Sequence, residues 1–242
     1  MKTMLTSLAE KIRTYGVLGA TRKVYTKLAR TMFPIPDPYS FLKNVTGVIH
    51  VGANLGQERE LYAKYGLSVL WIEPLPDIFL QLCANIKSFP NQTSVNYLIT
   101  DKDDEEYEFH IANNEGASSS IFELAQHREI WPDIHYTSSI TLKSITLDSL
   151  IKNIGLNINS YQALVMDAQG SELLVLRGAA KSLGYFKFIR TEAADFESYV
   201  HCARVEELTS YLGQFRFRLI RSDKFAEAPN AGQYFDLVYQ KF

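Results

Sequence analysis

Residues 48–56 read Val48-Ile49-His50-Val51-Gly52-Ala53-Asn54-Leu55-Gly56, an apolar run that ends in two glycines four residues apart. A helical pattern begins at Gln57, and a second apolar run ends in Trp71-Ile72-Glu73-Pro74. A strand, a glycine-containing turn, a helix and a second strand followed by an acid form a βαβ unit whose first loop holds a nucleotide-like ligand. This stretch predicts a largely parallel α/β sheet with a ligand site at its carboxyl edge.

The same alternation of strand-like and helical segments continues to the C-terminus and predicts one α/β domain over residues 41–242. Further strands are predicted over 69–72, 95–99, 107–111, 163–167 and 188–192, with a final antiparallel pair over 215–220 and 234–239. Helices are predicted over 57–65, 173–183 and 205–212, and another after Asp77 as its N-cap. The polar segment that follows residues 107–111 and runs to about Thr141 is predicted to be a long loop that carries substrate contacts. Residues 222–232 are predicted to be the loop that connects the final pair of strands.

Residues 1–40 are predicted to form a helical appendage and a proline-rich linker. Apolar residues recur at helical spacing over 5–15 and 24–32, and three prolines between 34 and 38 end the pattern. Residues 1–33 are strongly basic, while the chain as a whole has a net charge of −2. The main domain is therefore acidic, which argues against a nucleic acid partner, whereas the basic segment suits an anionic membrane surface or an acidic partner protein.

Cysteine content bears on the compartment and on metals. The chain has only Cys83 and Cys202, which lie far apart and lack metal-ligand spacing, so neither a zinc site nor a disulfide framework is predicted. No apolar run approaches the ~18 residues that span a bilayer. We therefore expect a cytoplasmic protein, with a possible peripheral membrane contact through its basic N-terminal segment. No metal ligands are assigned, although carboxylates that share a crevice could coordinate a divalent ion, so the use of a metal stays open.

The glycine spacing of residues 52–57 discriminates between nucleotide-like ligands. A dinucleotide fingerprint would need glycine where Asn54 and Gln57 stand, and no Gly-Lys-Ser/Thr phosphate loop is present. Asparagine tolerates left-handed backbone, so Gly52-x-Asn54-x-Gly56 fits an S-adenosylmethionine loop. Glu73, at the end of the second strand, can accept hydrogen bonds from both ribose hydroxyls, although a NAD site also places an acid there.

Six motifs in the expected order resemble the FkbM-type methyltransferases over about residues 45–240. The resemblance implies a class I, Rossmann-like methyltransferase fold, S-adenosylmethionine as cofactor, and O-methylation of sugars or hydroxylated natural products. The motifs are Val51-Gly52-Ala53-Asn54-x-Gly56, Ile72-Glu73-Pro74-x-Pro76, Asn85-Ile86, Ser118-Ser119-Ser120, Thr146-Leu147-Asp148-Ser149-Leu150 and Val165-Met166-Asp167-Ala168-Gln169-Gly170-x-Glu172-x-x-Val175-Leu176-x-Gly178-Ala179.

Nine residues are predicted to contact the cofactor. Asp101 follows the third strand, where such folds often contact the adenine amino group. His50 stands where the family commonly has Asp, and a charged imidazole there would repel the sulfonium. Position 165 also departs from the frequent Lys-Ile-Asp version of its motif. The nine residues are His50, Gly52, Ala53, Asn54, Gly56, Glu73, Pro74, Asp101 and Ser119.

Three carboxylates are the catalytic candidates, because a hydroxyl is a poor nucleophile until a base removes its proton. Asp167 ends one strand and is predicted to be the base, and Glu192 ends the next and is predicted to orient the acceptor. Glu172 opens the intervening helix, where an acid also serves simply to stabilise the helix N-terminus.

Other hypotheses stay open from the sequence alone. Trp131, His135 and Tyr136 can offer a stacking surface for a sugar or pack locally, and His110, His127, His135 and His201 lack ligand-like spacing. The leading function is methyl transfer to a sugar or glycan-type small molecule. A noncatalytic Rossmann-like subunit of a glycan-assembly complex is the alternative, followed by a NAD or nucleotide-sugar enzyme.

Overall fold

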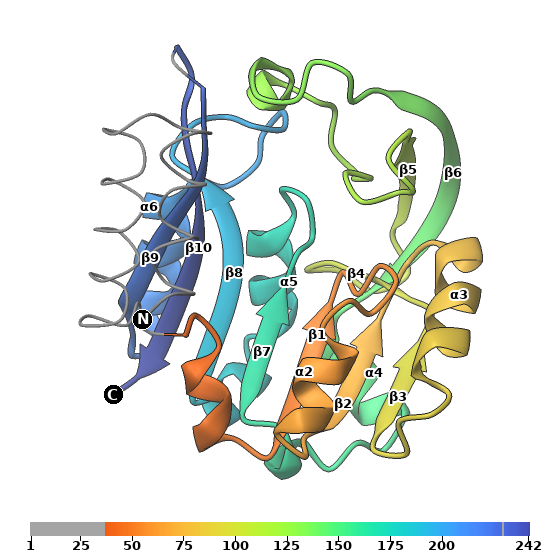
Figure 1. Ribbon diagram of the computed structural model, residues 1–242, viewed down its shortest axis with the longest axis vertical. Helices are drawn as coiled ribbons and strands as arrows, with labels where there is room; N and C mark the ends of the chain where they lie inside the picture. Colours follow the sequence, from red (N-terminus) through yellow and green to blue (C-terminus); the bar gives the residue numbers. More distant parts are fainter. Residues whose placement is uncertain (1–36, 229) are drawn as a thin grey trace, which may run out of the picture. The chain divides into compact units, whose positions relative to one another are not determined.

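The central sheet contains strands in the spatial order β3 (Gln92–Val95), β2 (Ser68–Ile72), β1 (Gly47–Val51), β7 (Ala163–Met166), β8 (Phe188–Ala194), β10 (Gly232–Lys241) and β9 (Phe217–Ala228). The computed structural model describes residues 37–228 and 230–242 (Figure 1). Neighbouring strands from β3 to β8 are parallel, and β10 is antiparallel to both β8 and β9. The predicted mostly parallel sheet with an antiparallel C-terminal end is confirmed.

Helices cover both faces of this sheet (Figure 1). Helices α2 (Arg59–Lys64) and α3 (Pro76–Ile86) lie on one face, and α4 (Leu147–Asn153), α5 (Glu172–Gly178) and α6 (Val205–Gln214) lie on the other. Leu150, Leu176 and Leu212 from the second group are fully buried in one cluster with inward-facing sheet residues. Each such side chain contributes ~1.5–3 kcal/mol of hydrophobic stabilisation. In the described part of the chain, no helix is long and apolar enough to cross a membrane.

A second, smaller sheet has the order β4 (Leu98–Ile99), β6 (Tyr136–Ile145) and β5 (Glu106–Ala112). The prediction of one strand over 95–99 was wrong. Asn96 donates its side-chain amide to the carbonyl oxygens of Glu73 at 2.7 Å and Pro74 at 2.9 Å, and the chain leaves the central sheet there. The predicted long loop was also wrong at its end, since β6 begins at Tyr136 with an exposed polar run, and its apolar alternation starts only at Ile140.

Several element boundaries differ from those predicted. Helix α3 begins at Pro76 with Leu75 as N-cap, so Asp77 lies in the first turn and is not the cap. Proline suits this first helical position because its φ is already helical and its missing N–H has no partner to lose there. Helix α5 ends at Gly178, before the 3₁₀ turn Ser182–Tyr185. Most of the predicted loop 222–232 belongs to β9, which reaches Ala228.

The predicted appendage lies almost wholly in residues 1–36, outside the described residues. Residues 41–242 form one compact unit that contains both sheets. The short 3₁₀ turns within it are η1 (Ser40–Asn44, whose first residue precedes the unit), η2 (Gln126–Glu129), η3 (Ile158–Ser160) and η4 (Ser182–Tyr185).

Candidate active site

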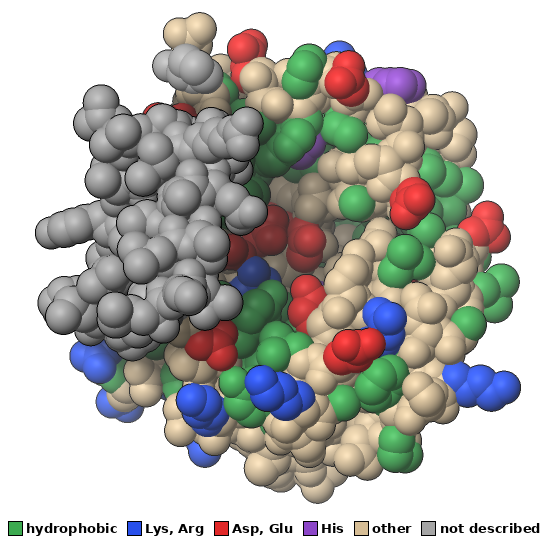
Figure 2. All heavy atoms as spheres, viewed as in Figure 1, with side chains coloured by type: hydrophobic (Ala, Val, Ile, Leu, Met, Phe, Trp, Pro, Cys, Tyr) green, Lys and Arg blue, Asp and Glu red, His purple; other side chains and the backbone are tan. Residues whose placement is uncertain are grey.

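Two cavities of about 250 Å³ each adjoin at the carboxyl ends of the parallel strands. The first cavity lies between the β1–α2 loop, Glu73 and Ser119, and the second lies between η2, Glu192 and Tyr199. Asp167, Gln169 and Ala117 line both cavities. Acidic side chains gather in the hollow at the centre of the face shown in Figure 2.

The β1–α2 loop starts at Gly52, whose φ of +78° lies in the left-handed region. A Cβ at Gly52 would lie only 1.8 Å from the backbone carbonyl oxygen of Asp167, so the ends of β1 and β7 can meet only with glycine there. Asn54 has φ +44°, which confirms the predicted left-handed backbone. The backbone N–H of Asn54 donates to Glu73 Oε2 at 2.8 Å and ties this loop to the end of β2.

Glu73 is buried in the wall of the first cavity. Its Oε2 accepts from Asn54, and its Oε1 accepts from the backbone N–H of Leu75 at 2.9 Å. Burial raises the pKa of Glu73 to about 7, while the two backbone donors act in the opposite direction. A carboxylate oxygen has a second lone pair, so each can still accept a hydroxyl proton from a ligand.

His50 is buried in β1 and lines the first cavity. Burial lowers its pKa to about 4, so the imidazole is neutral near pH 7. Its Nδ1 lies 3.1 Å from the hydroxyl of Tyr62, and its ring stacks on Trp71 with 4.9 Å between centroids. A neutral ring does not repel a cation, and the charged groups in the described wall of this cavity are the acids Glu58, Glu73 and Asp167.

Most of the predicted cofactor residues meet in this wall, but Gly56 and Asp101 do not. The Cβ position of Gly56 would lie 2.7 Å from Leu82 Cδ1, so this glycine allows the loop to pack against α3. Asp101 follows β4, which has left the central sheet, and Tyr97 and Phe109 line the cavity on that side instead. The predicted residues in the wall are His50, Gly52, Ala53, Asn54, Glu73, Pro74 and Ser119.

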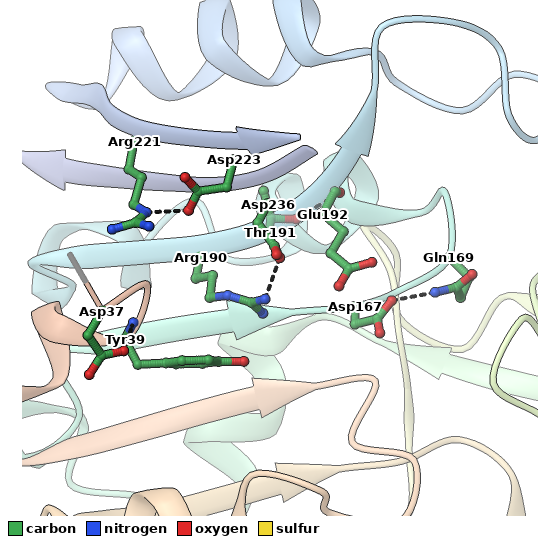
Figure 3. Close-up of polar contacts among 10 residues, drawn as sticks. All are labelled: Asp37, Tyr39, Asp167, Gln169, Arg190, Thr191, Glu192, Arg221, Asp223 and Asp236. Atoms are coloured by element: carbon green, nitrogen blue, oxygen red, sulfur yellow. Dashed lines mark hydrogen bonds and ion pairs between the residues drawn. The ribbon is translucent and has the colours of Figure 1, made fainter. Parts of the chain in front are cut away.

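A row of acids crosses neighbouring strands beside the second cavity. The β7–β8 register brings Asp167, just after β7, level with Glu192, and Asp236 on β10 pairs with Glu192 in register. Arg190 lies two residues before Glu192 and forms an ion pair with Asp236 (Figure 3). Among the described residues, no group of three or more His, Cys, Asp or Glu side chains is arranged to hold a metal ion.

Asp167 and Glu192 differ in how readily they ionise. Burial raises the pKa of both carboxyls, and for Glu192 the nearby charge of Asp167 raises it further. A hydrogen bond from the Gln169 side chain and the charge of Arg190 favour the ionised form of Asp167. Near neutral pH, Asp167 is therefore the carboxylate and Glu192 holds the proton of the pair.

Glu172 is buried at the start of α5 and also lines the second cavity. Its Oε1 accepts from the backbone N–H groups of Ala168 at 3.0 Å and Gly170 at 3.2 Å. These bonds enclose Gln169, whose φ is +47° and whose Oε1 accepts from the Tyr199 hydroxyl at 2.5 Å. This geometry makes Glu172 a support for the loop that follows β7, while its predicted catalytic role stays a prediction.

The serine cluster mainly holds the loop 113–122 together. Ser119 Oγ accepts from the backbone N–H of Ala112 at 3.0 Å, and Ser120 Oγ donates to the Gln169 carbonyl at 2.7 Å. Through Ser120, this loop is attached to the residue that separates the two cavities.

The aromatic wall of the second cavity differs from the predicted set. Trp131 lines this cavity, but His135 is exposed and Tyr136 donates its hydroxyl to the Phe122 carbonyl at 2.6 Å. The remaining aromatic residues come from distant parts of the chain, so no local spacing could have grouped them. They are His127, Tyr199, Phe225 and Tyr234.

A family model described as the methyltransferase FkbM domain matches residues 50–219. A 2-O-methyltransferase, NoeI of Sinorhizobium fredii (strain NBRC 101917 / NGR234), is 24% identical over 208 residues, which cover 81% of each chain. M. capricolum TrmK with S-adenosyl-homocysteine is a solved structure of 9% identity and TM-score 0.49, covering 84% of this chain and 67% of that one. Magnesium protoporphyrin IX methyltransferase (ChlM) from Synechocystis PCC 6803, with bound SAM, has 9% identity and TM-score 0.46, with coverage of 97% and 84%.

Proposed function

The chain belongs to the FkbM methyltransferase family, and on that premise we propose that it transfers a methyl group to a hydroxyl of a sugar, glycan or other hydroxylated small molecule. It is an S-adenosylmethionine-dependent methyltransferase. The observation that carries the proposal is the meeting of two cavities at Asp167, one for the donor and one for the acceptor. The relative named as a 2-O-methyltransferase supports transfer to oxygen.

The first cavity fits the donor. Glu73 can accept hydrogen bonds from the two ribose hydroxyls, and the loop from Gly52 to Asn54 lets a ligand approach the backbone closely. The acids of its described wall suit a cation, and neutral His50 does not oppose one. Bound there, S-adenosylmethionine supplies an electrophilic methyl group.

The second cavity receives the acceptor, and its carboxyls prepare the hydroxyl. Asp167 would accept the hydroxyl proton, which makes the oxygen nucleophilic toward the methyl carbon. As the oxygen–carbon bond formed, the bond from that carbon to the sulfonium sulfur would break, and S-adenosylhomocysteine would leave. Glu192, still protonated, donates a hydrogen bond that orients the acceptor. Alignment of the two ligands supplies part of the ~7–11 kcal/mol that well-oriented reactions gain.

Calorimetry tests the donor site. We expect S-adenosylmethionine and S-adenosylhomocysteine to bind, and NAD not to bind. Mass spectrometry of a glycan pool incubated with labelled donor should then show the added methyl group. If neither S-adenosylmethionine nor S-adenosylhomocysteine bound, the result would favour a noncatalytic scaffold, and NAD binding would favour a NAD or nucleotide-sugar enzyme.

Replacing Glu73 with Gln should weaken donor binding about tenfold to hundredfold, because a charge-assisted acceptor of ribose is lost. The side-chain NH2 of the introduced glutamine would also lie against the backbone N–H of either Asn54 or Leu75, so that two donors would oppose each other. Titration with S-adenosylhomocysteine measures the effect. Glu60→Gln, an exposed acid on α2, is the matched control and should bind as the wild type does. Equal affinity in both variants would remove Glu73 from the donor site.

The acceptor kcat/KM should follow a bell-shaped pH profile. Burial raises the pKa of Asp167 to about 6, and the base works only when deprotonated, so activity should rise with pH through that value. Burial and the Asp167 charge raise the pKa of Glu192 to about 9, and activity should fall as Glu192 loses its proton. Initial rates at constant ionic strength measure both limbs. Glu192→Gln should lose the alkaline limb, and a rate independent of pH would contradict both assignments.

A further inference from the structure

His127 lies in the wall of the second cavity with only 4% of its surface exposed. Its Nδ1 lies 2.8 Å from the hydroxyl oxygen of Tyr234. Its Nε2 is buried and has no hydrogen-bond partner among the described residues. Buried polar atoms in folded proteins are nearly always paired, so an unpaired ring nitrogen in a cavity wall indicates a bond that a ligand completes.

The neighbours of His127 determine which ring nitrogen holds the proton. Burial lowers the pKa of His127 to about 4, so the ring is neutral and has one N–H. A phenol O–H is a stronger donor than the N–H of a neutral imidazole, so the favoured arrangement has the Tyr234 hydroxyl donating to His127 Nδ1. In this arrangement the imidazole proton lies on Nε2, which is then a donor.

The rest of the cavity wall defines what His127 can meet there. Trp131 lies 4.6 Å and Tyr199 5.1 Å from the His127 ring, centroid to centroid, and Tyr234 packs edge-on at 6.0 Å. Apolar ring faces of this kind pack against the C–H face of a saturated ring. The cavity wall thus combines an aromatic surface with the ring nitrogen of His127 that has no partner among the described residues.

The side chains with a carboxyl group in the described wall of the second cavity are Asp167, Glu172 and Glu192, and Asp167 is the ionised member of its pair with Glu192. No lysine or arginine lines the cavity within the described ranges. An acceptor with a carboxylate or phosphate beside its reacting hydroxyl would bring negative charge next to ionised Asp167, and Arg190, whose charge acts on Asp167, already forms an ion pair with Asp236. Burying an uncompensated charge is strongly unfavourable.

From these observations we infer that His127 is the specificity-determining contact for an uncharged, hydroxylated ring. Its Nε2–H donates a hydrogen bond to a hydroxyl or ring oxygen of the acceptor, whose apolar face packs on Trp131 and Tyr199. Uronic acids and sugar phosphates are excluded at this position by the acidic wall. The inference rests on the proposed methyl transfer to oxygen and adds the class of acceptor and the residue that selects it.

Matched sugars test the acceptor class. Methyl glycosides of glucose, galactose and mannose, each paired with the corresponding uronic acid glycoside, are incubated with the protein and labelled donor. At least one neutral glycoside should be methylated, with kcat/KM at least about tenfold above that of its uronic acid partner. A uronic acid that reacts as well as its neutral partner would overturn the inference, as would methylation of none of the neutral sugars. S-adenosylhomocysteine binding, measured in parallel, tests the proposed donor site independently of the acceptor class.

Variants at position 127 test the hydrogen bond. His127→Phe keeps an aromatic ring beside Trp131 but has no donor, and it should raise the acceptor KM about tenfold with kcat within about twofold. His127→Gln restores an N–H donor and should recover part of the loss. If His127 acts only in selecting the acceptor, both variants should keep the S-adenosylhomocysteine affinity and the melting temperature of the wild type. An unchanged KM in folded His127→Phe, or a loss of kcat alone, would overturn the assignment.

The tautomer gives a readout that needs no acceptor. Nitrogen-15 shifts of the His127 ring should identify a neutral imidazole protonated at Nε2, and Tyr234→Phe should disturb this preference by removing the bond to Nδ1. A ring protonated at Nδ1 in the wild type would contradict the donor role.

Discussion

Replacing Asp167 with Asn is expected to lower kcat by about a thousandfold, since a positioned base contributes roughly 10²- to 10⁴-fold and an amide cannot accept the proton. The amide keeps the shape of the carboxyl and an oxygen that can still accept from Gln169. Donor affinity should change by less than about threefold, because the bonds of Glu73 and the β1–α2 loop are untouched. Single-turnover methyl transfer and calorimetry with S-adenosylhomocysteine measure the two quantities separately.

Asp77→Asn is the matched control for this substitution. Asp77 is exposed in the first turn of α3 and lines neither cavity, so turnover should be unchanged. The Asp167 variant should fold normally, because burial already disfavours the charged form of that carboxyl. Wild-type turnover by Asp167→Asn would remove it from the role of base and leave Glu192 as the next residue to replace.

Replacing Gly52 with Ala is expected to destabilise the protein by about 3 kcal/mol or more and to abolish donor binding. The left-handed φ alone costs roughly 1–2 kcal/mol for a residue with a Cβ. The new methyl would also lie 1.8 Å from the Asp167 carbonyl oxygen, a backbone atom that can move only if β1 and β7 separate. Urea unfolding measures the stability, and calorimetry measures the donor affinity.

Gly66→Ala separates these two costs. Gly66 has a similar φ of +66°, is exposed, and has no atom within 4 Å of an added Cβ. It should lose only the roughly 1–2 kcal/mol of backbone strain and should bind the donor normally. If both alanine variants lost the same stability and both still bound the donor, the close approach of Gly52 to the Asp167 carbonyl oxygen would not be needed for the donor site.

Features encoded by neighbouring residues were predictable from the sequence. The run Val48–Val51 is fully buried in β1, and the left-handed Asn54 lies where the glycine spacing placed it. Glu73 accepts a hydrogen bond from the same loop because β1 and β2 are adjacent and parallel, so that their carboxyl ends lie side by side. Strand alternation, turn residues and helix spacing are local properties, so they carry this information without knowledge of the rest of the chain.

Features that depend on one side chain meeting another from far along the chain were missed. The run 95–99 looks continuous, but hydrogen bonds from Asn96 to the end of β2 divide it between two sheets. After that division, Leu98 and Ile99 of β4 line the first cavity, whereas Asp101 is not among its lining residues.

By itself, the sequence determined the parallel α/β domain, the glycine loop with Glu73 beside it, and the position of Asp167 at the end of its strand. Glu192 was also predicted to end its strand, but β8 continues for two residues beyond it to Ala194. Tertiary structure alone decided that His50 is neutral, that Asp167 is the more acidic of the pair, and that His127 faces Tyr234 across 107 positions of sequence. The physical reason is that spacing encodes backbone geometry, whereas ionisation and unpaired hydrogen-bonding atoms depend on burial and on neighbours that only the packed chain brings together.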